Sequence, residues 1–398
     1  MMEINDMYDY LIIGCGLTGM VIARELAEND YKVLIIEKRN HIGGNMYDYI
    51  DHNGLLVQKY GPHVFFTDNE NIEKYVTKFI PVEKFYPECR TYISGEAIPM
   101  PFNFNSIDII YPDKNYAAKL KEELEGEFGI NSIVSVLDVI NSKNDMIHDY
   151  GMYMYENEYK KYTAKQWNKN IDEIEPSVFM RVPVYISEKK PYLKEKYQFM
   201  PVGGFTKLAK SIINHPNITV SLEENALDKI SIDEQEKKIV YDHFYSKTII
   251  YTGPLDALFS YRFGELPYRA LEFTWKVIKK QSAPKTPLSA YPEGDKYIRI
   301  TDYSQFPPQE FGDNALIAIE YPFEYKRNEL CGNEPYYPTL TKESKKMFKQ
   351  YKSLANEYQN LLWCGRLAEF KYFNMDSIIE NALDLAKNII MKDKKYVE

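Results

Sequence analysis

Residues 8–39 read YDYLIIGCGLTGMVIARELAENDYKVLIIEKR, and this stretch decides the fold that the sequence predicts. Residues 8–13 are rich in β-forming side chains, and a cluster of glycines follows them. Apolar residues then recur at helical spacing, and residues 32–37 form a second apolar run. The order strand, tight turn, helix, strand predicts the βαβ unit that opens a Rossmann-like domain.

The glycines of this stretch form a GxGxxG motif at Gly14, Gly16 and Gly19, and Glu37 ends the second strand. Glycines let the backbone turn tightly beside a pyrophosphate, the helix N-terminus offers amide donors, and the acid accepts from a ribose hydroxyl. The motif alone is weak evidence, but in this strand–turn–helix–strand context it predicts a dinucleotide site. The alternative is that the glycines only tighten the turn.

A second glycine pair indicates which dinucleotide is bound. Gly43 and Gly44 precede Asn45, a few residues after Glu37. Flavoproteins of the two-dinucleotide type continue their fingerprint with such a pair, whereas NAD enzymes generally do not. The sequence therefore favours FAD, and an ordinary glycine loop is the alternative.

Composition narrows the class of protein. The 398 residues are 44% hydrophobic and 27% charged, and the net charge of −9 argues against nonspecific binding to nucleic acid or to a membrane surface. No apolar run approaches membrane-span length, so we expect no stable membrane insertion and a cytoplasmic location. The four cysteines form no CxxC pair, and the six histidines show no ligand spacing. We therefore expect neither a redox dithiol nor a metal.

The rest of the chain predicts a discontinuous architecture. Asn53-Gly54 is a plausible hairpin turn, residues 69–80 look helical, and residues 105–180 are mostly helical. Short apolar-aromatic strands broken by Pro and Gly are expected from about 255 to 340. The C-terminal segment again predicts a strand, a glycine turn and an amphipathic helix. Strand–turn–helix patterns at both ends indicate one nucleotide-binding domain assembled from separate segments.

Four segments resemble one family closely: YTAKQW (162–167), YRFGELPYR (261–269), EPYYP (334–338) and GRLAEFKY (365–372). They are similar to the UDP-galactopyranose mutases, flavoenzymes that interconvert UDP-galactopyranose and UDP-galactofuranose. The resemblance runs nearly from end to end of the chain. It implies an α/β fold in which a discontinuous Rossmann-like FAD-binding domain carries an inserted helical domain and an antiparallel β-sheet domain.

The resemblance also implies domain bounds and an assembly. The FAD-binding domain would comprise residues 1–85, 200–255 and 341–398. The helical domain would comprise residues 105–180, and the sheet domain residues 86–104, 181–199 and 256–340. Such mutases are often dimers, so a homodimer is the implied oligomer.

The implied activity is a non-redox isomerisation that contracts the pyranose ring of UDP-galactopyranose to a furanose. In the family the reduced flavin attacks through N5 and forms an adduct with C1 of the sugar while UDP is displaced. The implied partners are a sugar-nucleotide substrate and an external reductant, NAD(P)H or reduced flavin. The furanose product would feed the biosynthesis of cell-surface polysaccharide.

Matching the family motifs position by position assigns roles to residues of this chain. The FAD cradle would consist of Gly14, Gly16, Gly19, Glu37, Lys38, Gly43, Gly44, Asn45, Gly365 and Arg366. The substrate would contact Phe66, Tyr162, Thr163, Trp167, Arg181, Tyr192, Arg299, Tyr336, Tyr337, Tyr372 and Asn374. Catalytic roles fall to Arg181 and Arg299, which hold the diphosphate, and to His63 and Arg366 beside the flavin ring. Arg299 is expected on a mobile loop. On the residues alone, structural hydrogen bonding explains His63 better than catalysis does, and solvated surface explains Arg181, Arg299 and Arg366 equally well.

Four positions depart from the family pattern. Arg90 stands where members have a small or apolar residue, and Cys364 stands in place of a glycine beside the flavin. Phe66 stands where many bacterial members have a second histidine, and Asn374 stands where aspartate is common. A variant substrate, dTDP-fucopyranose or UDP-N-acetylgalactosamine, would fit a reshaped pocket, and neutral drift in a galactose enzyme is the alternative. A flavin amine oxidase-type oxidoreductase shares the cradle but would not need Arg181 and Arg299. A catalytically inactive flavin-binding protein is the weakest hypothesis.

Overall fold

The computed structural model describes residues 8–167, 183–188, 192–242, 248–294, 296–327 and 334–397. The chain divides into two compact units. The first unit comprises Met1–Lys84, Glu195–Tyr268 and Pro335–Glu398, and the second comprises Phe85–Lys194 and Arg269–Glu334. The helical segment and the antiparallel sheet both lie in the second unit, and their division into two domains stays a prediction.

The first unit is built around a parallel sheet of five strands in the order β12-β2-β1-β15-β21. All residues of the central strands YLII and VLII are buried, as expected when both faces of a parallel sheet are covered. The strands come from three distant parts of the chain, so the predicted discontinuous Rossmann-like domain is confirmed. They are β1 (Tyr10–Ile13), β2 (Val33–Ile36), β12 (Ile218–Ser221), β15 (Thr248–Tyr251) and β21 (Leu361–Trp363).

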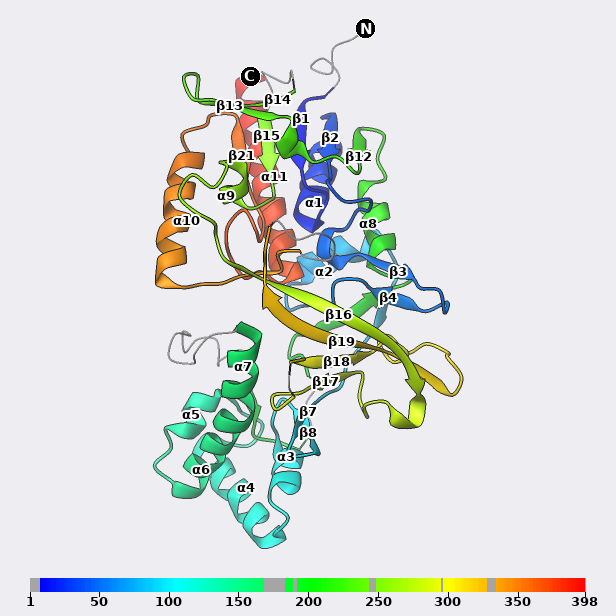
Figure 1. Ribbon diagram of the computed structural model, residues 1–398, viewed down its shortest axis with the longest axis vertical. Helices are drawn as coiled ribbons and strands as arrows, with labels where there is room; N and C mark the ends of the chain where they lie inside the picture. The colour runs from blue at the N-terminus through cyan, green and yellow to red at the C-terminus, as the bar shows by residue number, and fades with distance from the viewer. Residues whose placement is uncertain are drawn as a thin grey trace. The chain divides into compact units, whose positions relative to one another are not determined.

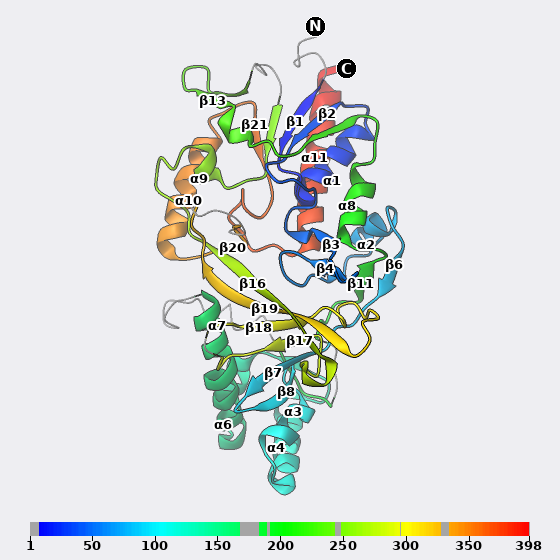
Figure 2. The ribbon, with the colours of Figure 1, turned by 45° about the vertical axis from the view of Figure 1, so that its right-hand side comes forward.

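Helices from both ends of the chain pack together on this unit. α1 (Leu17–Ala27) contacts both α8 (Phe205–Ile213) and α11 (Met375–Val397), and Figures 1 and 2 both show α1 and α11 side by side. α1 buries Val21, Ile22 and Leu26, the residues whose spacing predicted the helix. The remaining helices of this unit are α2 (Glu70–Thr77), α9 (Leu255–Leu258) and α10 (Lys342–Ala355).

Smaller antiparallel elements complete the first unit. β3 (Asp48–Ile50) and β4 (Leu56–Gln58) form the hairpin predicted at Asn53-Gly54, and Gly54 has φ +82°. β11 (Tyr197–Pro201) lies between β5 (Phe65–Thr67) and β6 (Val82–Lys84). A second hairpin joins β13 (Ile230–Asp233) to β14 (Lys238–Tyr241).

The second unit contains the predicted helical segment. Polar side chains cap several helix N-termini: Asn103, Asp113, Ser135 and Asn144 each accept a hydrogen bond from a backbone N–H of the first turn. The helices are α3 (Phe104–Ile110), α4 (Lys114–Phe128), α5 (Val136–Ile140), α6 (Asp145–Met154), the π-helical turn η3 (Tyr155–Tyr159) and α7 (Lys160–Trp167). A short strand, β9 (Ile133–Val134), interrupts them and pairs with β10 (Val184–Tyr185).

The large sheet of the described residues has seven strands, in the order β20-β16-β19-β18-β17-β7-β8, with the short strand β20 (Tyr337–Pro338) at one end. From β16 to β8 it is antiparallel except for the parallel pair β17–β7. The bounds are β7 (Cys89–Ile93), β8 (Glu96–Met100), β16 (Tyr268–Lys279), β17 (Leu288–Ala290), β18 (Arg299–Asp302) and β19 (Asn314–Glu324). The expectation of only short strands is wrong, because β16 and β19 have 12 and 11 residues. The prolines and glycines flanking β16 lie outside its span, and the ladder with β19 continues past Pro322, which pairs with Leu271.

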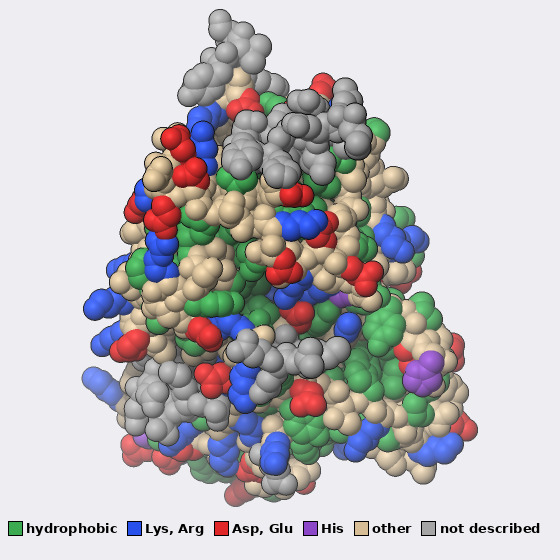
Figure 3. Space-filling model, turned by 45° about the horizontal axis from the view of Figure 1, so that its top comes forward, with side chains coloured by type: hydrophobic (Ala, Val, Ile, Leu, Met, Phe, Trp, Pro, Cys, Tyr) green, Lys and Arg blue, Asp and Glu red, His purple; other side chains and the backbone are tan. Residues whose placement is uncertain are grey.

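The described residues form no membrane-spanning helix, and the face drawn in Figure 3 carries charges of both signs. None of their helices is both long enough and apolar enough to cross a membrane. Acidic and basic side chains are interspersed over the face drawn in Figure 3. This mixture agrees with a modest net charge of −9 on 398 residues.

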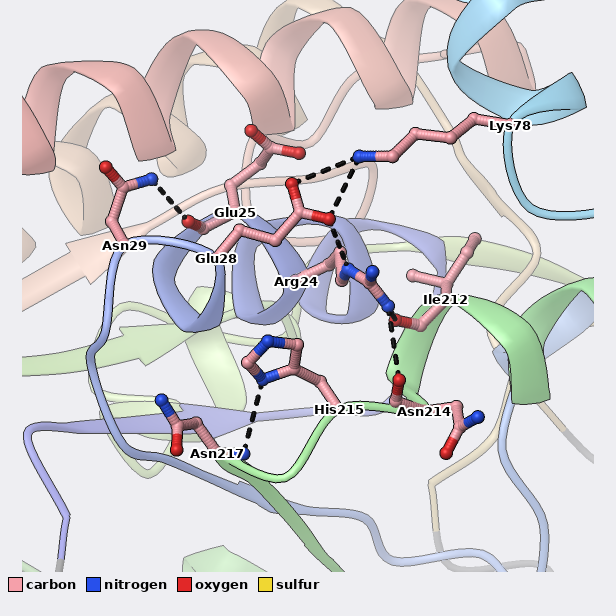
Figure 4. Close-up of polar contacts among 9 residues, drawn as sticks. All are labelled: Arg24, Glu25, Glu28, Asn29, Lys78, Ile212, Asn214, His215 and Asn217. Carbon is pink, nitrogen blue, oxygen red and sulfur yellow. Dashed lines mark hydrogen bonds and ion pairs between the residues drawn. The ribbon is translucent and has the colours of Figure 1, made fainter.

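Arg24 joins α1 to the end of α8 (Figure 4). Its Nη1 donates to the carbonyl oxygens of Ile212 at 3.3 Å and Asn214 at 3.2 Å, and its Nε donates to Glu28 Oε1 at 2.8 Å. Lys78 Nζ donates to the same Glu28 carboxylate at 2.9 Å. Carbonyls at a helix C-terminus lack helical partners and favour a cation, so Arg24 both caps α8 and fixes it to α1.

Replacing Arg24 by Met should lower the free energy of unfolding by about 1–2 kcal/mol, because two helix-end carbonyls and Glu28 lose a donor. The matched control is Lys74→Met, which breaks only the exposed pair between Lys74 and Glu70 on α2 and should change stability little. Urea denaturation of both variants measures the difference. Equal losses in the two variants would contradict the capping role.

Candidate active site

Two glycines allow the turn after β1 to enter α1. Gly14 has φ +107°, and a Cβ there would lie 2.1 Å from Thr252 Oγ1. A Cβ on Gly19 would lie 2.1 Å from the carbonyl oxygen of Gly14. Gly16 precedes the first residue of α1 and gives the helix no side-chain cap. The first turn of α1 therefore presents its amides without a competing acceptor at the cap position.

Two further glycine turns lie against this one. Gly44 has φ +57°, and a Cβ there would lie 3.0 Å from Cα of Gly16. The neighbouring Gly43 donates its N–H to the carbonyl oxygen of Cys15 at 2.9 Å. Gly365 has φ +104°, and a Cβ there would lie 2.6 Å from Thr18 Oγ1. The structure thus brings the predicted cradle glycines from three parts of the chain to the start of α1.

Glu37 lies at the same place. Its buried carboxylate accepts from the backbone N–H of Cys15 at 2.8 Å and of Arg39 at 2.9 Å. Lys38, predicted with it, is exposed. Burial raises the pKa of the Cys15 thiol to about 12, so this cysteine is uncharged at neutral pH. The group that faces the glycine turn is therefore the Glu37 carboxylate.

Arg39 was not among the predicted site residues, but it bonds one of them, Asn45. Its Nη2 donates to Asn45 Oδ1 at 3.0 Å, and its guanidinium lies 4.8 Å from the ring centroid of Tyr60. Asn45 in turn donates to the carbonyl oxygen of Pro335 at 3.5 Å. Arg39 follows Glu37 and Lys38 in the sequence EKR, and a cation two residues after the ribose acid was the signal available.

His63 is held by a tight local network. Gln58 accepts from the backbone N–H of His63 and donates to its carbonyl oxygen at 2.9 Å. The His63 Nδ1 lies 2.8 Å from the carbonyl oxygen of Gly61. Because a carbonyl only accepts, Nδ1 carries a proton and Nε2 is the basic nitrogen. Phe66 follows on β5, where it pairs with Gln198 of β11.

Aromatic side chains gather around Arg366 in the first unit. Tyr337, in the short strand β20 (Tyr337–Pro338), stacks on Tyr372 with a centroid distance of 4.8 Å and an interplanar angle of 10°. The Arg366 guanidinium lies 5.4 Å from the centroid of Tyr337. Tyr336 is buried and contacts the edge of Tyr60. Asn374 is exposed and directly precedes α11.

The second unit holds the other predicted substrate residues. Tyr162 and the buried Thr163 lie on α7, which Trp167 ends, and burial raises the pKa of the Tyr162 and Tyr192 phenols. Both phenols lie within electrostatic range of Arg299. Arg181 lies outside the described residues.

Arg299 opens β18, so the loop expected for it is wrong. It pairs in the sheet with Ala290 on one side and Glu320 on the other. Its Nε and Nη2 donate to Glu320 Oε2 at 3.0 Å and 2.6 Å. The strand holds the backbone of Arg299, and the ion pair with Glu320 holds its guanidinium.

Lys165 is a second residue that the sequence reasoning missed. Its ammonium donates to the carbonyl oxygens of Tyr291 at 2.8 Å, Gly294, and Tyr297 at 3.3 Å. These contacts fasten α7, and so Tyr162, to the segment that leads into β18. Lys165 lies three residues after Tyr162 in YTAKQW, but no local pattern names its three distant acceptors.

Glu158 is a buried carboxyl beside these residues. It lies on η3, one turn before Tyr162, and accepts a hydrogen bond from Thr91 Oγ1 of β7. Burial raises the pKa of Glu158 from its ordinary value of 4.5 to about 7, against the opposing effects of Thr91 and Lys165. Part of the population therefore carries a buried negative charge at neutral pH.

The raised pKa of Glu158 predicts a pH-dependent stability. Between about pH 4.5 and pH 7 the folded carboxyl holds a proton that the unfolded one has lost, so the free energy of unfolding falls as pH rises. The loss across this window is up to about 3 kcal/mol. Denaturation of the wild type and Glu158→Gln at several pH values isolates it, because Gln does not titrate. A constant difference between the two proteins would contradict the prediction.

The α/β fold and the glycine turns at α1 define a Rossmann-like dinucleotide-binding protein. Residues 12–79 match the family model described as an NAD(P)-binding Rossmann-like domain, and residues 157–372 match the model described as UDP-galactopyranose mutase. The chain is 32% identical to a probable UDP-galactopyranose mutase of Klebsiella pneumoniae over 96% of this chain and 94% of that relative. It therefore belongs to the UDP-galactopyranose mutase family and is an enzyme of the isomerase class.

Two further comparisons bear on the sequence relatives and on the fold of the chain. A dTDP-fucopyranose mutase of Escherichia coli is 30% identical over 97% of this chain and 99% of that relative. The crystal structure of a reduced UDP-galactopyranose mutase matches with a TM-score of 0.72 and 17% identity, covering 96% of this chain and 94% of that one. At that identity the structural match shows the fold.

Proposed function

We propose that this protein is a flavin-dependent mutase that converts a sugar-nucleotide pyranose into its furanose, with UDP-galactopyranose as the first candidate substrate. The observation that carries the proposal is the meeting of Gly16, Gly44 and Glu37 at the start of α1, in a chain of this family. The bound cofactor is proposed to be FAD, kept reduced by an external reductant such as NAD(P)H or reduced flavin.

The residues at α1 fit such a cofactor. The N-terminus of α1 has neither a side-chain cap nor an acidic residue in its first turn, so its amides suit a pyrophosphate. A Cβ on Gly44 would fall against Gly16, so the two glycines keep side chains out of this approach. The Glu37 carboxylate suits a ribose hydroxyl. Reduced FAD, when bound, supplies the nucleophile for the anomeric carbon of the sugar.

The protein side chains would hold the leaving nucleotide. The Arg299 guanidinium suits the oxygens of a diphosphate, and Arg181 is proposed as its companion. Burial keeps the phenol of Tyr192 protonated, so this residue would donate to a phosphate oxygen without adding charge, and Tyr337 and Tyr372 are proposed to act likewise. Retaining the nucleotide matters because it must reattack the carbon that it left.

His63 and Arg366 are proposed to act beside the flavin ring. The Nδ1 of His63 faces the carbonyl oxygen of Gly61, so Nε2 is the atom that could accept a proton during ring opening and closure. The Arg366 cation lies over the face of Tyr337, where it would favour negative charge on a neighbouring group. Tyr162, Thr163 and Trp167 are proposed to contact the nucleobase and sugar.

The identity of the sugar is a separate question. Phe66 gives the site an apolar ring where many family members have a histidine, and Asn374 replaces a carboxylate with an amide. Both changes suit a less polar hexose. A relative named dTDP-fucopyranose mutase makes a 6-deoxy sugar nucleotide the second candidate, ahead of UDP-N-acetylgalactosamine.

A chromatographic turnover assay, with and without dithionite, tests the proposal. UDP-galactopyranose, dTDP-fucopyranose and UDP-N-acetylgalactosamine would be supplied in parallel. A furanose product that forms only under reduction supports a flavin-dependent mutase, and the highest kcat/KM identifies the sugar. Oxygen consumption with substrate and no furanose product would instead favour an oxidase.

Arg299→Ala should lower kcat/KM by about 10- to 150-fold, because each hydrogen bond to a charged group contributes about 1.5–3 kcal/mol. Arg299→Lys should fall between the wild type and Ala, because lysine keeps the charge but loses the planar fork. Arg262→Ala is the matched control, because Arg262 is paired with Glu234 at the surface. Flavin absorbance should be unchanged in all three. Loss of flavin in Arg299→Ala would contradict the assignment of Arg299 to the substrate diphosphate.

Gly44→Ala should weaken flavin binding, because its Cβ would press against Gly16 at 3.0 Å. Gly54→Ala is the control: Gly54 also has a positive φ, of +82°, but a Cβ there meets nothing within 4 Å. Both variants carry a backbone strain of about 1–2 kcal/mol. Flavin content after purification and the dissociation constant for added FAD separate them. Equal flavin affinity in the two variants would contradict the proposal that Gly44 lines the flavin site.

A further inference from the structure

The buried carboxylate of Glu158 is expected to destabilise the folded state in its present surroundings. Its side chain is 5% exposed, and among the described residues it forms no ion pair and accepts one hydrogen bond, from Thr91. Thr91 is fully buried and bonds Oε2, which leaves Oε1 as an acceptor without a protein donor in the described part of the chain. A buried carboxylate with so little compensation is destabilising unless another donor satisfies it.

The groups around Glu158 indicate where that donor would come from. Tyr162 follows Glu158 by four residues, so both side chains lie on one face of the continuing helix. The phenols of Tyr162 and Tyr192 both lie within electrostatic range of Glu158 and of Arg299. Aromatic rings beside an arginine are the surroundings that a planar base attached to a phosphate requires.

The nearby cations bond other groups, and none of their described hydrogen bonds goes to the Glu158 carboxylate. The ammonium of Lys165 is directed at three backbone carbonyls, and Arg299 is paired with Glu320. Lys160 pairs with the exposed Glu156 on the same helix. The group that Glu158 lacks is therefore a neutral N–H donor that enters beside Tyr162.

We propose that Glu158 reads the nucleobase: Oε1 accepts the imide N–H of a uracil or thymine ring that lies on Tyr162. This proposal rests on the proposed sugar-nucleotide function. A cytosine ring has an acceptor nitrogen at that position, so it would face the lone pairs of the ionised carboxylate and bind poorly. Because burial raises the pKa of Glu158 to about 7, this discrimination is expected above about pH 7. Uracil and thymine share the imide N–H, so Glu158 admits both and leaves their distinction to other residues.

Equilibrium binding to the full-length flavoprotein tests the proposal, with UDP, CDP and N3-methyl-UDP as probes. N3-methyl-UDP carries a methyl group in place of the imide hydrogen, so it lacks the donor and is bulkier at that position; the Glu158→Leu variant separates the two effects. The wild type should bind UDP at least about tenfold more tightly than either analogue, because the analogue leaves a buried acceptor unpaired. In Glu158→Leu the preference for UDP over N3-methyl-UDP should fall to within about twofold.

Two further variants keep the test decisive. Thr91→Val combined with Glu158→Leu replaces both partners by apolar groups of similar shape, so it should fold even where Glu158→Leu alone does not. It should show the same loss of preference. Glu156→Gln, on the same π-helical turn but exposed, is the matched control and should bind all three probes like the wild type.

The outcomes separate the two proposals. Equal affinity of the wild type for UDP and N3-methyl-UDP would overturn the role of Glu158 and leave the mutase proposal standing. A preference for UDP that persists in the double variant would overturn it as well. If the protein binds neither UDP nor dTDP, the result would overturn both the proposed function and this inference.

Discussion

The close approach of Gly16 and Gly44 is the constraint on which the first unit depends. A side chain on Gly44 would lie 3.0 Å from Cα of Gly16, so the close approach of the loops after β1 and β2 favours a glycine at position 44. The parallel register of β1 and β2 sets the positions from which these loops leave the sheet. The same sheet places β21 beside β15, which brings Gly365 against Thr18. Segments more than 300 residues apart thus meet at one helix end because one sheet contains them all.

The second unit is organised by buried and half-buried charges. Glu320 holds Arg299, backbone carbonyls hold Lys165, and Glu158 has a single hydroxyl partner. Charges taken out of water are expensive, and compensation is close to complete for the first two and poor for the third. Incomplete compensation is a common mark of a site that a ligand completes, which is why Glu158 and not Lys165 indicates a binding role.

Local patterns predicted much of this architecture. The period of apolar residues located β1, α1 and β2, and Asn53-Gly54 located the β3–β4 hairpin. The family motifs named Arg299 but not its place on a strand. That place depends on the ladders of β18 with β17 and β19, which are long-range contacts that no local spacing encodes. Arg39, Lys165 and Glu158 were missed for the same reason, because their partners are distant in the sequence or are backbone atoms.

Two of the departures from the family pattern, at Asn374 and Phe66, have different physical weight. Asn374 is exposed, and its carbonyl accepts from the Ile378 N–H as the residue before a helix does. Asparagine and aspartate serve that position almost equally, so the change removes a charge near a helix N-terminus, worth about 0.3–1 kcal/mol, and leaves the backbone undisturbed.

Phe66 is a different case. It lies on β5 opposite Gln198, in the sheet that follows His63, and an aromatic ring there supplies bulk without a hydrogen-bonding group. A lost charge at an exposed helix end is easily tolerated by any substrate. Phe66 removes a hydrogen-bonding group three residues after His63, so of the two positions it is the stronger candidate for setting the proposed choice of sugar.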